Sequence, residues 1–163
     1  LDELHAGLRR SYRSLVNKGL RELEIREGPA AFEGYRIVHV AAAGGTAPRP
    51  EATYHYQCQW LDTGSGLVLV GWRGGEPVAA VYLIVYKGDA YYASGPSTEP
   101  NAMHALLWAS IEQLQAEGVR RFELGWQGHA QDEKGRAIEF FKAGFGGQTV
   151  PIVTYGTEWG GAA

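Results

Sequence analysis

Apolar residues recur every three or four positions in several stretches of the chain, a spacing that is typical of amphipathic helices. The first such stretch covers residues 1–19 and ends at Gly19, an expected stop signal. Its apolar side is formed by Leu1, Leu4, Leu8, Tyr12 and Leu15. The pattern predicts further helices at residues 30–43, 51–62, 101–117 and 136–144, with Gly118 closing the fourth of the five.

Shorter apolar runs between glycines and turns predict strands at residues 23–25, 67–72, 78–86, 90–94, 119–126 and 149–155. The three strands between residues 67 and 94 are joined by tight turns and should form an antiparallel meander. A polar loop is expected at 127–135. This order of elements predicts a mixed, mostly antiparallel sheet flanked by helices, in the α/β (α+β) class.

The length of 163 residues fits a single domain, residues 1–163, and 45% hydrophobic residues can build its core. The net charge of -3 argues against general polyanion binding. The lone cysteine, Cys58, excludes an internal disulfide and fits a reducing, cytoplasmic setting. No apolar run approaches the roughly 20 residues that span a bilayer. Because the sequence begins at Leu1 rather than Met, we expect that it is the C-terminal part of a longer protein or a processed form.

Three stretches resemble the Fem-type branch (FemAB-like) of the Gcn5-related N-acyltransferase superfamily. Residues 91–97 (YYASGPS) are similar to a family strand that ends in tyrosine and a small Ser/Gly turn. Residues 107–125 resemble the family's helix, glycine, and strand with an acidic residue and a glycine. Residues 138–147 (IEFFKAGFGG) resemble the Phe-Lys-x-x-Phe-Gly-Gly signature near the family's C-terminus. The resemblance spans about residues 50–150 and implies a GNAT fold.

The resemblance also implies an activity, namely transfer of an acyl or aminoacyl group to an amine. Family members move amino acids from aminoacyl-tRNA onto peptidoglycan precursors, and well-known members carry two copies of the fold. The donor expected here is aminoacyl-tRNA or acyl-CoA, with no tightly bound cofactor. The expected partners are a small-molecule or peptide amine acceptor and tRNA.

Lys142 is the leading candidate for catalysis. By resemblance, Phe141 and Lys142 match the pair that contacts the aminoacyl-tRNA terminus and stabilises developing negative charge. An ammonium can neutralise an oxyanion. The alternative is a cation in the last turn of a helix, favoured there by the helix dipole.

Two further residues are candidate proton acceptors. Strand alternation places Glu123 and Gly125 on one face and Phe122 on the other, so Glu123 could accept the amine proton. His129, in the polar loop, has a suitable pKa for a base. The five histidines and one cysteine show no metal-ligand spacing, so no metal is expected.

The donor is expected to contact Tyr92, Ser94 and Ser97 at the turn after the third meander strand. Ordinary acetyl-CoA-dependent members place a glycine-rich phosphate loop there, and this chain lacks it. Pro96 and Pro100 each remove an N–H donor, which argues against ordinary CoA binding. Tyrosines near this turn should divide between the cleft and the core. These are Tyr82, Tyr86, Tyr91 and Tyr92.

Arg9, Arg10 and Arg13 lie three and four residues apart on the first helix and form the most basic stretch. Arg9 and Arg13 are candidates for binding donor phosphate, and a solvated helix face is the alternative. Three functions therefore remain open: a Fem-like transferase, a CoA-dependent N-acetyltransferase, and a non-catalytic module that packs or binds.

Overall fold

The computed structural model describes residues 1–126 and 131–151. Its sheet has the strand order β1-β2-β3-β4-β5. The strands are β1 (Glu24–Glu27), β2 (Gly66–Arg73), β3 (Glu76–Tyr86), β4 (Asp89–Ser94) and β5 (Arg121–Glu123). Neighbours from β1 to β4 pair antiparallel, whereas β5 pairs parallel to β4. The predicted meander and the mixed, mostly antiparallel sheet are both confirmed.

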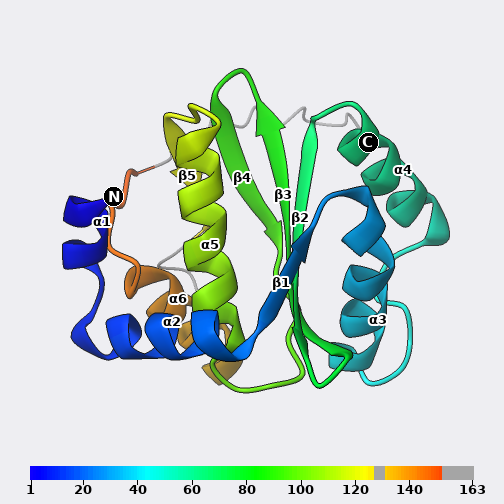
Figure 1. The fold of residues 1–163 in the computed structure, drawn as a ribbon, viewed down its shortest axis with the longest axis horizontal. Coiled ribbons are helices and arrows are strands. Elements are labelled where there is room, and N and C mark those ends of the chain that lie inside the picture. Colours follow the sequence, from blue (N-terminus) through cyan, green and yellow to red (C-terminus); the bar gives the residue numbers. More distant parts are fainter. Residues whose placement is uncertain (127–130, 152–163) are drawn as a thin grey trace, which may run out of the picture.

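Helices cover both faces of this sheet (Figure 1). One side carries α1 (Asp2–Gly7), α2 (Arg10–Glu22), α5 (Ala102–Ala116) and α6 (Glu133–Ala143), and the other carries α3 (Phe32–Ala42) and α4 (Glu51–Asp62). A short 3-10 helix, η1 (Pro29–Ala31), links β1 to α3. The predicted helix 51–62 has the observed bounds, and Gly118 closes α5 with φ +78.

Strand β3 explains why the core has two halves. Its side chains alternate, so Val81 and Leu83 pack towards α5 while Ala80 and Tyr82 pack towards α3 and α4. A strand covered on both faces reads as a continuous apolar run, which is what residues 78–85 show. A third cluster joins α2, α5 and the end of α6. It contains Leu8, Tyr12, Val16, Leu107, Trp108 and Phe145.

The prediction of one helix over residues 1–19 is wrong, because the chain breaks between α1 and α2. Leu8 is extended and buried, and the Arg9 N–H donates to the Gly144 carbonyl at 2.9 Å. Gly19 does not end a helix either. It lies inside α2 where a Cβ would be 2.5 Å from the Ala105 Cβ, so its role is close packing of α2 on α5.

The elements after α5 also differ from expectation. Strand β5 covers only Arg121–Glu123 rather than 119–126, because pairing with β4 ends at Glu123. Helix α6 begins at Glu133 rather than 136, since the Asp132 carboxylate accepts from the Gly135 N–H at 2.6 Å. Of the predicted strand 149–155, residues 149–151 are not in a strand and the remainder lies outside the described residues.

Candidate functional site

Strands β4 and β5 separate after a short parallel ladder. The ladder pairs Asp89 with Arg121, Ala90 with Phe122 and Tyr91 with Glu123. Beyond this point β4 continues to Ser94, paired only with β3 among the described residues. The chain after Glu123 turns away, and Gly125 has the left-handed φ of +79. The candidate site lies where the two strands part.

Lys142 points to this place from the last turn of α6. Its Nζ donates to the carbonyl of Trp126 at 3.3 Å. A Cβ built on Gly125 would lie 3.4 Å from Lys142 Nζ and 3.4 Å from Tyr91 Oη. Partial burial lowers the pKa of Lys142, an effect that the Glu139 carboxylate opposes. The ammonium is therefore half-buried and held beside the separating strands.

Glu123 lies on the same sheet face as Tyr91, because the two residues pair in the ladder. Its side chain is exposed. Phe122 and Leu124 point the other way and pack against the α5 side of the core, which confirms the predicted alternation. Glu123 is the last residue of β5 and lies two residues before Gly125 in the chain.

Phe141 positions α6 through aromatic packing. Its ring centroid lies 5.1 Å from that of His104, 5.2 Å from Phe145 and 6.2 Å from Tyr12. Gly144 allows this approach, because a Cβ there would be 2.1 Å from the Tyr12 ring. Phe141 therefore anchors the helix turn from which Lys142 reaches towards Gly125.

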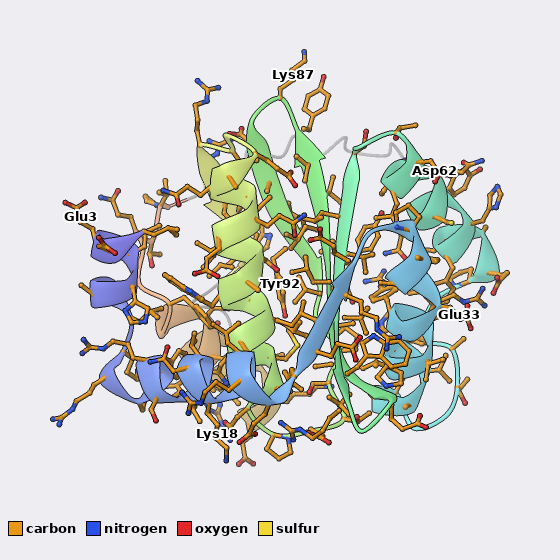
Figure 2. The ribbon with its side chains drawn as sticks, in the orientation of Figure 1. Glu3, Lys18, Glu33, Asp62, Lys87 and Tyr92 are labelled. Atoms are coloured by element: carbon orange, nitrogen blue, oxygen red, sulfur yellow. The ribbon has the colours of Figure 1, made fainter. Side chains whose placement is uncertain are left out.

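The residues predicted to contact the donor are not all gathered at Lys142. Tyr92 projects between α5 and the sheet (Figure 2), where burial raises its pKa to about 12. Ser94 is the half-buried last residue of β4. Ser97 forms a turn, since its Oγ donates to the Glu99 carbonyl at 2.7 Å. Tyr92 and Ser97 thus have evident structural roles.

The remaining tyrosines divide between the core and the surface. Tyr82 is fully buried towards α3 and α4 and donates to the Gln57 carbonyl at 2.7 Å. Tyr86 is 65% exposed next to the β3–β4 turn, where Lys87 projects outward (Figure 2). Tyr91 alone of these lies beside Lys142 and Gly125.

Arg9, the residue that precedes α2, lies on a different side of α6 from Lys142. The Arg9 guanidinium is stacked over the Phe140 ring, 3.7 Å from its centroid. Phe140 and Lys142 are two positions apart, about 200° around a helix, so they point in nearly opposite directions. Arg10 is exposed and Arg13 half-buried. The structure brings Arg9 to α6 but not to the Lys142 site.

His129 lies outside the described residues, so its prediction stays a prediction. Gly125 is not among the site residues predicted from the sequence.

The sequence contains a pointer to it, because Gly125 lies two residues after Glu123, on the same predicted strand face, in the family-like stretch. Within residues 1–126 and 131–151, no group of three or more His, Cys, Asp or Glu side chains could hold a metal ion. Within those residues, no helix is long and apolar enough to cross a membrane.

Comparisons with known solved structures bear on the fold of the chain. The chain is similar to FemX, at 10% identity and a TM-score of 0.71 over 88% of this chain and 55% of FemX. It is also similar to the aminoglycoside N-acetyltransferase AAC(6')-Iy, at 10% identity and a TM-score of 0.62 over 84% of this chain and 95% of that one. The ribosomal-protein-alanine N-acetyltransferase of Brucella melitensis biovar Abortus 2308 matches at 12% identity and a TM-score of 0.56, over 85% of this chain and 99% of that one.

These likenesses concern the fold, and the chain spans about half the length of FemX. No curated protein sequence matches the chain. A family model described as an acetyltransferase (GNAT) domain matches residues 4–142. That range contains the helices, the sheet and Lys142. The chain therefore belongs to the acetyltransferase (GNAT) domain family.

Proposed function

We propose that this enzyme transfers an acyl or aminoacyl group from an activated donor directly to an amine, in the manner of the Fem-like enzymes, with Lys142 stabilising the charge that develops on the carbonyl oxygen. The observation that carries the proposal is the half-buried Lys142 ammonium beside the separating strands. An ammonium in a partly dehydrated place interacts with a developing oxyanion more strongly than one in bulk water.

The reaction needs no covalent enzyme intermediate. The lone pair of a neutral acceptor amine attacks the donor carbonyl carbon, and the C=O π pair moves to the oxygen, which becomes an oxyanion next to Lys142. The nitrogen loses one proton, which Glu123 accepts directly or through water. The pair on oxygen then re-forms the carbonyl and expels the leaving group, which takes a proton. The products are an amide and the free donor alcohol or thiol.

The loop after β4 supports an aminoacyl donor over CoA. Pro96 and Pro100 have no N–H, the Thr98 N–H is bound to the Val78 carbonyl, and the Glu99 N–H to Ser97 Oγ. Few backbone donors are left for a pyrophosphate.

Side chains near the start of α5 do not replace those donors. The cavity there is only about 90 Å³ in volume. Two cations line it: Arg73 is already paired with Glu22 and Glu99, and Lys18 lies 3.8 Å from a Glu22 carboxylate oxygen. A pyrophosphate would have to compete with both carboxylates for the guanidinium.

The second candidate is a CoA-dependent N-acetyltransferase. It is favoured by the likeness to AAC(6')-Iy, whose structure was determined with CoA and of which this chain covers 95%. Thermal-shift titration separates the candidates, because a ligand stabilises the folded state that binds it. Stabilisation by a non-hydrolysable alanyl minihelix supports the first, and stabilisation by acetyl-CoA the second. A folded protein that responds to neither would be a non-catalytic module.

The test of the mechanism is Lys142→Ala. We expect turnover to fall by more than about tenfold, since removing an oxyanion-stabilising group typically costs more than that. Lys134→Ala, an exposed lysine on the same helix, is the matched control and should keep its activity. Circular dichroism should show both variants folded. Unchanged turnover in Lys142→Ala would exclude this lysine from catalysis.

A further inference from the structure

Gly125 leaves an empty position between two polar groups that come from different elements. The point where its Cβ would lie is 3.4 Å from Lys142 Nζ, on α6, and 3.4 Å from Tyr91 Oη, on β4. These separations are close to hydrogen-bond length for an atom slightly displaced from that point. An oxygen atom placed there would meet an ammonium and a phenol together.

Tyr91 is suited to act as a donor at this position. Its side chain is 40% exposed, and within the described residues its hydroxyl makes no hydrogen bond. It is the last β4 residue in the ladder with β5, so its backbone is fixed where the strands part. The backbone of Tyr91 is thus fixed, and its O–H can donate a hydrogen bond.

We propose that Tyr91 is the second donor of an oxyanion hole whose first donor is Lys142, and that Gly125 keeps the space for the oxygen open. This inference rests on the proposed function and adds a residue to it. When the amine attacks, the electron pair that moves to the carbonyl oxygen is stabilised by the Lys142 ammonium and by a hydrogen bond from Tyr91. Tyr91 keeps its proton, and the pair returns when the leaving group departs.

Tyr91→Phe tests the proposal because it removes only the hydroxyl. We expect kcat to fall about 100-fold, the typical loss for one oxyanion-hole donor, with KM unchanged. Tyr86→Phe is the matched control, since Tyr86 is 65% exposed on the adjacent strand away from Lys142, and it should keep the wild-type kcat. Rates are measured with acetyl-CoA and with an alanyl minihelix as donors.

A second measurement does not depend on knowing the donor. The chain has four lysines, so ¹³C-lysine labelling gives four side-chain NMR signals. Acetate, a small oxyanion, should shift the Lys142 signal in the wild type and in Tyr86→Phe. Its affinity should be at least fivefold weaker in Tyr91→Phe, and binding should be abolished in Gly125→Ala, where the methyl group fills the hole.

The outcomes separate this inference from the proposed function. If Lys142→Ala loses activity while Tyr91→Phe keeps it, the function stands and Tyr91 is not a donor. If Lys142→Ala keeps activity, the proposed mechanism itself fails. If neither donor supports turnover, the acetate titration decides: an absent response in the wild type, or equal affinity in Tyr91→Phe, overturns the oxyanion hole.

Discussion

His104 is a buried histidine at the centre of the aromatic cluster that anchors α6. Its ring meets that of Tyr12 at 4.3 Å and that of Phe141 at 5.1 Å, and its Nδ1 lies 3.1 Å from the Asn101 carbonyl. Burial lowers the pKa of His104. The hydrogen bond with the Asn101 carbonyl opposes this effect, and the nearby Arg9 adds a smaller lowering. A neutral ring therefore belongs to the folded state.

This predicts how stability depends on pH. As pH falls through the ordinary histidine value of 6.5, the unfolded chain binds a proton at residue 104 before the folded protein does. The free energy of unfolding therefore falls with pH until the folded pKa is passed. In His104→Leu, the loss of stability between pH 7.5 and pH 5.5, measured by urea unfolding, should be smaller than in the wild type.

His39 provides a second, independent test, because burial also lowers its pKa and it lies in α3, on the other side of the sheet. His39→Leu should reduce the same pH dependence independently, and the two effects should add. An unchanged slope in His104→Leu would mean that the ring is not kept neutral by its surroundings.

At this scale the sequence predicts some site residues and not others. Lys142 could be named as a candidate, because the family-like run of residues 138–147 is continuous in the sequence. The meeting of Lys142, Gly125 and Tyr91 could not, since it depends on where β4 and β5 separate. The alternation of side chains along a strand predicts the sheet face on which Glu123 lies. It does not predict how many residues of β5 pair with β4.

Helices α2 and α5 show which features of a helix the sequence pattern predicts and which depend on tertiary contacts. The apolar spacing over residues 1–19 predicts helix correctly, but the break at Leu8 follows from the Arg9 N–H bond to Gly144, a partner far along the chain. Gly19 has the sequence signature of a helix end. Its true role, contact with Ala105, is visible only once the two helices are packed together.

The contact between Gly19 of α2 and Ala105 of α5 predicts how a substitution changes stability. Gly19→Ala should destabilise the protein by about 1–3 kcal/mol, because overpacking outweighs the roughly 1 kcal/mol that alanine gains in a helix. Gly7→Ala is the control, since a Cβ there has no atom within 4 Å. Urea unfolding measures both.

Ala105→Gly provides the second arm of the experiment. In the Gly19→Ala background it removes the methyl group that collides, so the double variant should recover part of the lost stability, with a coupling energy of about 0.5–3 kcal/mol. Simple additivity of the two single changes would show that α2 and α5 do not touch at this point.

For the whole molecule, the separation of Arg9 from Lys142 bears on how a large anionic donor would bind. The net charge is -3, so long-range attraction for nucleic acid must come from a local surface. Arg10 and Arg13 belong to α2, which directly follows Arg9, the residue that stacks on Phe140 of α6. If the donor is an aminoacyl-tRNA, as proposed above, we expect its acceptor stem to contact Arg10 and Arg13 while its acceptor end reaches Lys142.

Arg10→Glu with Arg13→Glu should therefore weaken minihelix binding. The loss should be largest at low salt, and the slope of log affinity against log salt should become shallower by about 1–2 units, as expected when two phosphate contacts are removed. Arg9 is left intact because its stacking on Phe140 supports α6.

Lys87→Glu with Arg49→Glu makes the same change in net charge on loops elsewhere and should leave the slope unaltered. Fluorescence anisotropy between 50 and 300 mM salt, on the order of the range over which such contacts are screened, distinguishes the two pairs. An equal effect of both pairs would show that only net charge matters.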